Sequence, residues 1–399
     1  MKVAKRAEVP AFQVMSILDR VATLRAAGRD VISLCAGEPS GGAPSDVNRI
    51  AADQHAGDAS LGYTSALGLL EVRAAVAGHY RRWYGLDVAP EEVAITTGSS
   101  GAFVLAFLAA FDAGDRVALA APGYPAYRNI LSALGCEVVQ LQCGPATRFQ
   151  PTPELLDDAV REHGPLEGLI VASPANPTGT MVSRSELAAL SAWCRSNDVR
   201  LVSDEIYHGI TYPAPDNPDP RGVCAWEQDK TGFVISSFSK YWGMTGWRLG
   251  WALVPEDLRR AVDALAGNVA LCPPAPAQYA ALGAFTDDSY LQADERVAAF
   301  AATRADLLAQ LPRLGWGPVA PADGAFYLYA SLGDRLGSFP DSTAWCAALL
   351  EESGVAVVPG IDFDPFDGGS YVRLSFAAGR DATAEAVRRI VAFQEQRLG

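Results

Sequence analysis

Short runs rich in Val, Ile and Leu alternate along the chain with longer segments that have a helical pattern of apolar positions. The first helix candidate spans 69–84, and a later one spans 185–197. The apolar runs show little alternation of polar and apolar residues, which is typical of strands covered on both faces. The predicted strands are 93–97, 116–121, 137–141, 168–172, 199–203, 233–237 and 248–254.

This alternation predicts an α/β domain with a largely parallel sheet, because parallel neighbours need a crossover segment between them. Between residues 237 and 248 the chain is too short for a crossover helix, so those two strands should be antiparallel neighbours. We therefore expect seven strands in a mostly parallel sheet with one antiparallel strand, flanked by helices.

Beyond residue 279 the pattern changes. A helix is predicted over 294–310, strands near 326–329, 355–358 and 371–376, and a final helix from Ala382. This part reads as a smaller α+β domain completed by the N-terminal segment. We expect a large domain of residues 46–284 and a small domain of residues 1–45 and 285–399.

Composition narrows the functional classes. With 49% hydrophobic and 20% charged residues, the 399-residue chain is globular. A net charge of -14 argues against nucleic acid as a partner. No run of eighteen apolar residues and no signal peptide is present, so we expect no membrane segment and a cytoplasmic location. Seven cysteines without a C-x-x-C pair, and four histidines without an H-E-x-x-H motif, favour reduced thiols and no metal site.

Residues that could form a binding or catalytic site follow the ends of the predicted strands. Gly98-Ser99-Ser100-Gly101, Tyr124, Asn176, Asp204 and Lys240 each follow a different strand. In an open α/β sheet, ligands bind beyond the carboxyl ends of the strands. One edge thus collects a small-residue turn that opens a helix, an aromatic ring, an amide, a carboxylate and an amine. Alone, the turn is as well explained by a helix cap as by a phosphate site.

Lys240 is one of only four lysines, at positions 2, 5, 230 and 240, and it alone follows an apolar strand. A lysine there either extends its amine to solvent or is desolvated. A desolvated lysine has a lowered pKa and acts as a nucleophile or base. Asp204 either caps the next helix or carries a functional charge, and Tyr207, three residues later, should face the same way.

Two arginines lie among apolar residues. Arg248 is flanked by Trp247 and Leu249, and we expect it to be buried against an anion, which is either a carboxylate or a phosphate. Arg373 is central in a predicted apolar strand, where an unpaired guanidinium would be costly. It either forms an internal salt bridge, with the nearby aspartates 362, 364 or 367 as candidates, or it binds a substrate carboxylate.

In order along the chain, these residues match a known family. The sequence S-x-S-K at 237–240, followed by M-T-G-W-R-L-G at 244–250, is highly specific, and A-N-P-T-G at 175–179 and S-D-E-I-Y at 203–207 support it. The chain resembles the class I/II aminotransferases, which are fold-type I enzymes that depend on pyridoxal 5'-phosphate (PLP). The resemblance runs almost end to end, from Gly37-Glu38-Pro39 to Arg373-Leu374-Ser375.

The resemblance implies a role for each matching residue. Lys240 would hold PLP as a Schiff base and act as the general acid and base, with Asp204 on the pyridine nitrogen. Tyr207 and Asn176 would hold the phenolic oxygen of the ring, and Tyr124 would stack on the ring. The implied phosphate ligands are Ser99, Ser100, Ser237 and Arg248, with Tyr63 contributed across a homodimer that shares its active sites. The implied substrate contacts are Gly37, Asn176 and Arg373.

The resemblance also implies ping-pong transfer of an amino group between an L-amino acid and a 2-oxo acid. Some aspartate-specific relatives place a lysine at the position of Ser100, so a neutral or aromatic substrate is favoured here over a strictly acidic one. Arg6 or Arg20 could still supply a grip on a distal carboxylate. A PLP-dependent lyase or racemase, and a non-catalytic PLP-binding module, remain as alternatives on the same fold.

Overall fold

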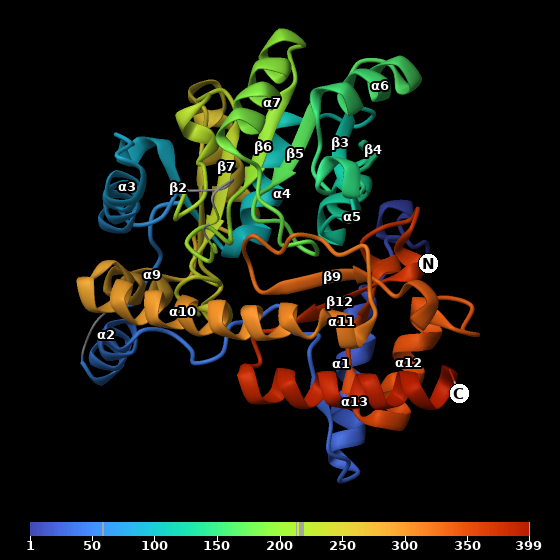
Figure 1. The fold of residues 1–399 in the computed structure, drawn as a ribbon. Coiled ribbons are helices and arrows are strands. Elements are labelled where there is room, and N and C mark those ends of the chain that lie inside the picture. The colour runs from blue at the N-terminus through green and yellow to red at the C-terminus, as the bar shows by residue number, and fades with distance from the viewer. Residues whose placement is uncertain (58–59, 213, 215–218, 399) are drawn as a thin grey trace.

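The computed structural model describes residues 1–57, 60–212, 214 and 219–398. Its centre is a seven-stranded sheet in the order β2-β8-β7-β6-β5-β3-β4 (Figure 1). Strand β8 is antiparallel to both β7 and β2, and the other neighbours are parallel, which confirms the predicted topology. The strands are β2 (Val93–Thr96), β3 (Arg116–Ala121), β4 (Glu137–Gln142), β5 (Gly168–Ala172), β6 (Arg200–Asp204), β7 (Phe233–Ser237) and β8 (Gly250–Leu253).

Helices cover both faces of this sheet, so successive strand residues alternate between two apolar cores. Phe107 of α4 and Val262 of α8 belong to one core, and Val76 of α3 and Leu190 of α7 belong to the other. The helices around the sheet are α3 (Leu70–Tyr84), α4 (Gly98–Ala110), α5 (Pro125–Leu134), α6 (Pro153–His163), α7 (Arg184–Ser196), α8 (Arg259–Val269) and α9 (Ala275–Ala281).

A second group of elements lies below the sheet in the view of Figure 1. Strands β11 (Val358–Pro359), β12 (Tyr371–Ser375) and β9 (Tyr327–Ser331) form an antiparallel sheet, and β1 (Ile32–Ser33) pairs in parallel with β10 (Val355–Ala356). The N-terminal segment therefore pairs with the C-terminal part, although the domain limits at 45/46 and 284/285 stay a prediction. The helices here are α1 (Gln13–Ala26), α2 (Ser45–Ala56), α10 (Asp287–Ala309), α11 (Leu311–Leu314), α12 (Ser342–Ser353) and α13 (Arg380–Leu398).

Three expectations about elements were wrong. The helix predicted over 69–84 is α3, but it is not the first, because α1 and α2 precede it. In α1, Val21 and Leu24 are buried, whereas Asp19 and Arg20 of the same helix are exposed. The helix predicted over 294–310 is α10, which begins earlier, at Asp287. Thr286 caps this helix by accepting a hydrogen bond from Ser289 N. The run 355–358 is divided between β10 and β11, which pair with different strands.

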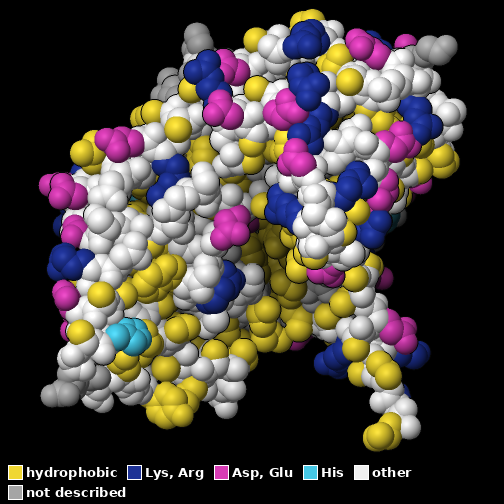
Figure 2. Space-filling view, turned by 90° about the horizontal axis from the view of Figure 1, so that it is seen from below, with side chains coloured by type: hydrophobic (Ala, Val, Ile, Leu, Met, Phe, Trp, Pro, Cys, Tyr) yellow, Lys and Arg dark blue, Asp and Glu magenta, His cyan; other side chains and the backbone are white. Residues whose placement is uncertain are grey.

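Two further features concern side-chain chemistry and surface. The seven cysteines are all free, and six of them are buried. No helix in the described ranges is long and apolar enough to span a membrane. Viewed from below, the molecule is hollowed near its centre, and apolar side chains gather in the hollow (Figure 2).

Candidate active site

A cavity of about 270 Å³ lies at the carboxyl ends of the central strands and is closed on its other side by residues of β9 and β12. This is the edge at which the topology predicts ligand binding. Of the residues expected in the site, Tyr63 and Ser237 do not line the cavity. Those that do are Gly37, Ser99, Ser100, Tyr124, Asn176, Asp204, Tyr207, Lys240, Arg248 and Arg373.

Lys240 extends into this cavity from the turn after β7. Its Nζ donates a hydrogen bond to the carbonyl oxygen of Gly37 at 2.6 Å. Burial lowers the pKa of Lys240 to about 8, opposed by the charge of Glu38 and reinforced by the positive charges of Arg248 and Arg373. The fraction of neutral amine near pH 7 is therefore far larger than for an exposed lysine, as a nucleophile or base requires.

Asp204 ends β6 and is 3% exposed. The amide of Ile206 donates to Oδ1 at 3.0 Å, and the hydroxyl of Tyr127 donates to Oδ2. Burial raises the pKa of Asp204 to about 6, while the two donors and Lys240 oppose that rise. Tyr127 was not among the residues predicted from the sequence. Its spacing of three residues from Tyr124 at the start of a helix is the signal that would have found it.

The start of α4 lines the same cavity as Lys240. Ser99 and Ser100 lie in the first turn of this helix, whose free amides and dipole favour negative charge. Arg248 completes the site, and its Nη1 donates to Thr245 O at 2.9 Å. A Cβ at Gly250 would lie 2.7 Å from Ser99 N, so only glycine lets β8 approach the turn this closely.

The expectation that Arg248 is buried was wrong. Arg248 is exposed in the single chain, although it also lines the cavity. Ser237 is buried behind the cavity, where its hydroxyl donates to Ser239 Oγ at 2.9 Å. Ser239 lines the cavity instead, and the role expected of Ser237 stays a prediction.

Arg373, on β12, is 4% exposed. Its Nη1 donates to Asn176 Oδ1 at 2.8 Å and its Nη2 donates to Cys35 O at 2.7 Å. Among the described residues its Nε has no hydrogen-bond partner and no carboxylate forms an ion pair with it. The alternative of a salt bridge to Asp362, Asp364 or Asp367 is therefore not found. A buried cation at the wall of a cavity, without a carboxylate partner, can bind an anionic ligand.

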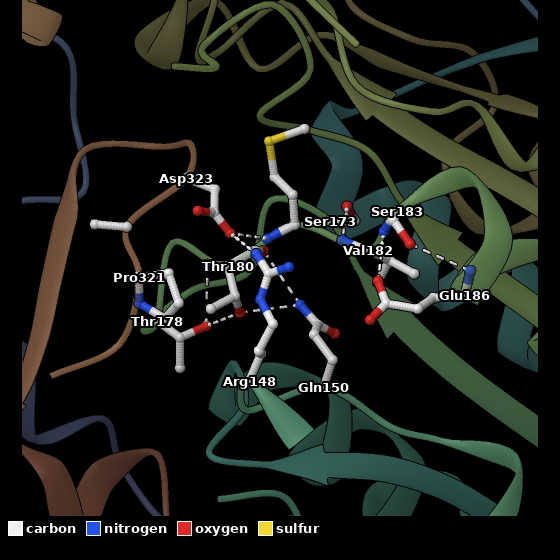
Figure 3. Close-up of polar contacts among 12 residues, drawn as sticks. Arg148, Gln150, Ser173, Thr178, Thr180, Val182, Ser183, Glu186, Pro321 and Asp323 are labelled. Atoms are coloured by element: carbon white, nitrogen blue, oxygen red, sulfur yellow. Dashed lines mark hydrogen bonds and ion pairs between the residues drawn. The ribbon is translucent and has the colours of Figure 1, made fainter. Parts of the chain in front are cut away.

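The loop that carries Asn176 is held from behind by a polar network (Figure 3). Arg148 forms an ion pair of 2.6 Å with Asp323, which also accepts a hydrogen bond from Met181 N at 3.2 Å. Gln150 Nε2 donates a hydrogen bond of 3.1 Å to the carbonyl oxygen of Thr180, which lies on the same loop as Asn176. The network ties the loop to the segment that leads into β9 and so fixes the position of Asn176.

The three tyrosines expected in the site differ in their surroundings. Tyr207 is 3% exposed, and its hydroxyl lies 2.7 Å from that of Tyr327. Tyr124 stacks on Phe12, with ring centroids 6.1 Å apart and an interplanar angle of 10°. Tyr63 is 86% exposed and lies outside the cavity of its own chain.

Helix α1 supplies an apolar wall. Val14 and Leu18 line the cavity, and neither was expected there. The two arginines that the sequence suggested as ligands for a distal carboxylate do not line the cavity of this chain. Arg20 pairs with Glu351 at 2.6 Å, and Arg6 lies in a groove beside the C-terminal end of α5.

A larger groove, of about 1020 Å³, lies at the opposite edge of the sheet, where β5, β6 and β7 begin. Its cations are paired with its anions: Arg200 contacts Asp257 at 2.6 Å, and Glu92 accepts both Arg259 and Lys230 at 3.3 and 3.4 Å. In the described part of the chain, β8 is the only strand of the seven-stranded sheet whose carboxyl end lies at this groove, so the groove lacks the convergence of the smaller cavity.

Comparison with known proteins agrees with the geometry. Residues 29–391 match the family model for aminotransferases of class I and II. A valine–pyruvate aminotransferase of Mycobacterium tuberculosis is 53% identical over 390 residues, covering 98% of this chain and 97% of that relative. An aspartate aminotransferase of Bacillus subtilis is 32% identical over 400 residues, covering 99% of this chain and 100% of that one. The crystal structure of an aminotransferase from Mycobacterium tuberculosis superposes with a TM-score of 0.94 at 52% identity, covering 99% of this chain and 100% of that one.

Proposed function

The chain belongs to the class I and II aminotransferases, and on that premise we propose that it uses PLP to move an amino group from a neutral L-amino acid to a 2-oxo acid. The observation that carries this proposal is the meeting of Lys240, Asp204 and the first turn of α4 in one cavity. An amine, a buried carboxylate and an anion site match the aldehyde, the pyridine nitrogen and the phosphate of PLP.

The residues present fit this cofactor. Lys240 would hold the aldehyde carbon, and Asp204 the ring nitrogen, with Tyr124 against the ring and Asn176 and Tyr207 at its phenolic oxygen. Arg373 lines the cavity and would hold the α-carboxylate of the substrate. Ser99, Ser100 and Arg248, which line the cavity, would hold the phosphate, and the same role for Ser237 stays a prediction. When bound, PLP supplies an electron sink for the bonds at the substrate Cα.

The protein's own part in the reaction is to orient the substrate and move a proton. Arg373 fixes the α-carboxylate, and the Asn176 hydrogen bond fixes the orientation of the guanidinium. With its lowered pKa, Lys240 Nζ would take the proton from the substrate Cα and return it to the cofactor carbon two bonds away. Burial raises the pKa of Asp204 to about 6, and a positive partner such as a protonated pyridine nitrogen would favour its ionised form further.

A single carboxylate site favours a ping-pong sequence. Both the amino acid and the 2-oxo acid carry an α-carboxylate, and Arg373 is the one buried arginine in the cavity lining of the described chain. The two substrates would then occupy the same place in turn, so the first product leaves before the second substrate enters.

The charges in the cavity favour a neutral side chain. The lining contains three basic residues, and each has an assigned partner: Lys240 the aldehyde, Arg248 the phosphate and Arg373 the α-carboxylate. None remains in this chain for a second carboxylate. Val14 and Leu18 form an apolar wall that suits an aliphatic or aromatic group. The valine–pyruvate activity of the 53%-identical relative supports the same class.

The exposure of Tyr63 supports the expected homodimer. Tyr63 is 86% exposed, and Leu70, Val269 and Leu271 are also at least half exposed. Large exposed apolar side chains near one another are typical of a subunit interface. We propose that a second copy covers them and that Tyr63 then contributes to its neighbour's phosphate site.

An assay with single substrates tests the proposed function. The purified enzyme is mixed with L-valine, L-alanine, L-phenylalanine or L-aspartate, first without and then with pyruvate. We expect neutral amino acids to give one equivalent of 2-oxo acid per site without an acceptor, and continuous turnover only with pyruvate. Continuous release of oxo acid without an acceptor would indicate a lyase, and a preference for aspartate would overturn the substrate class.

A further inference from the structure

The hydroxyl groups of Tyr207 and Tyr327 form a buried hydrogen bond of 2.7 Å at the wall of the cavity. We propose that Tyr327 is a positioning residue that donates this hydrogen bond to Tyr207 and thereby directs the Tyr207 proton into the cavity. The acceptor there would be the phenolic oxygen of PLP, so this inference rests on the proposed function.

Packing fixes the orientation of Tyr327 from three sides. Its ring lies under the guanidinium of Arg373, with Cζ 4.6 Å from the centroid, and meets the Tyr207 ring edge-on at 5.7 Å. Its hydroxyl oxygen occupies space that a Cβ at Gly37 would need. With 1% of its surface exposed, Tyr327 has no room to turn its hydroxyl away from Tyr207.

The two hydroxyl groups of Tyr207 and Tyr327 have two protons to donate. Burial raises the pKa of both phenols, so each carries its proton at neutral pH. One proton forms the hydrogen bond between the two hydroxyl oxygens, and the other can be donated to an acceptor outside the pair. If Tyr327 donates, Tyr207 keeps its own proton for an acceptor in the cavity. A donor that is itself hydrogen-bonded in this way is polarised and donates more strongly.

The groups around the pair favour an acceptor that carries negative charge. Asp204 and Lys240 face Tyr207 from the ends of β6 and β7, while Arg373 faces both tyrosines from β12. Tyr124 lines the cavity from the start of α5. A phenolate oxygen placed here would be stabilised by Tyr207, and the hydrogen bond from Tyr327 would strengthen that contact.

The test is a pH titration of the visible absorption of the PLP-loaded enzyme. We expect Tyr327→Phe to raise the midpoint by about 0.5 to 1 pH unit, because a weaker hydrogen bond stabilises the phenolate less. Tyr207→Phe should raise it at least as far, and the double variant should match Tyr207→Phe because Tyr327 acts through Tyr207. An effect of Tyr327→Phe that adds in full to that of Tyr207→Phe would overturn the inference.

Tyr329→Phe is the matched control. Tyr329 lies two residues further along β9, is fully buried, and its hydroxyl has no hydrogen-bond partner among the described residues. Its midpoint should equal that of the unmodified enzyme, and a Tyr327→Phe midpoint no different from this control refutes the proposal.

Replacing Tyr327 with 3-fluorotyrosine nearly keeps the shape of the side chain and makes it a stronger hydrogen-bond donor, so the midpoint of the titration should fall. This variant keeps the inference testable if Tyr327→Phe folds poorly. A midpoint that rises or does not move with this residue also counts against the inference. An unmodified enzyme that shows no visible band at all would instead refute the proposed function.

Discussion

The hydroxyl of Tyr127, in the first turn of α5, donates a hydrogen bond to Oδ2 of Asp204 at the end of β6. Both side chains are buried, and the second carboxylate oxygen is held by the amide of Ile206. The two donors fix the carboxylate plane and oppose the rise in pKa that burial imposes on Asp204. Tyr127 therefore acts as a positioning residue for the group expected on the pyridine nitrogen.

Replacing Tyr127 with Phe should weaken PLP binding and lower kcat/KM, each by about 10- to 100-fold, because hydrogen bonds to charged groups are the stronger ones. Equilibrium binding of PLP and steady-state kinetics measure the two effects. Tyr80→Phe is the control: Tyr80 is also buried and accepts a hydrogen bond from Trp251 Nε1 at 3.0 Å, but it does not line the cavity. Equal losses in both variants would remove the special role of Tyr127.

Capture of PLP by the cofactor-free protein should follow the neutral form of Lys240. The pKa of this amine is lowered to about 8, against an ordinary value of about 10.4. The rate of PLP uptake should rise about tenfold per pH unit below pH 8 and level off above it, since only the neutral amine attacks an aldehyde. Stopped-flow absorbance measures this rate. A rate that keeps rising to pH 10 would show that the amine is not desolvated.

Replacing Asp323 with Ala should disturb the loop that carries Asn176 (Figure 3). The change removes the acceptor for Arg148 and for Met181 N, so we expect a loss of about 1–3 kcal/mol in the free energy of unfolding and a lower kcat/KM. Urea denaturation and kinetics report the two effects. Asp257→Ala, which breaks an exposed ion pair to Arg200 of the same length, should cost less than about 1 kcal/mol and leave kcat/KM unchanged.

Replacing Ser100 with Lys should shift the substrate preference toward aspartate. The cavity lining of this chain has no cation left for a second carboxylate, and Ser100 lies at the cavity mouth in the first turn of α4. We expect the ratio of kcat/KM for L-aspartate to that for L-valine to rise about tenfold or more. Ser100→Gln, similar in size but neutral, should not raise it. A rise with both variants would point to shape rather than charge.

The sequence was sufficient to predict the sheet because its strands are local apolar runs. Strands β3, β5 and β7 begin and end where the sequence predicts, and the short link from β7 to β8 correctly indicated an antiparallel pair. Ten of the expected site residues line one cavity because parallel strands bring their carboxyl ends to the same edge.

What the sequence did not reveal depends on contacts between distant segments. Tyr327 was not predicted as a site residue, because its partner Tyr207 is 120 residues away. Val14 and Leu18 reach the cavity only because α1 packs beside it, which no local pattern indicates. Arg248 is exposed although Leu249 beside it is buried, so its apolar neighbours along the chain led to the wrong expectation.

The central claim is that Lys240 binds the cofactor covalently, and peptide mapping after borohydride reduction tests it most directly. The chain has four lysines, at positions 2, 5, 230 and 240, so the modified one is easily assigned. We predict that the reduced pyridoxyl group is found on the Lys240 peptide alone and that Lys240→Arg abolishes the labelling. A label on Lys2, Lys5 or Lys230 instead, or a Lys240 peptide of unmodified mass, would contradict the account.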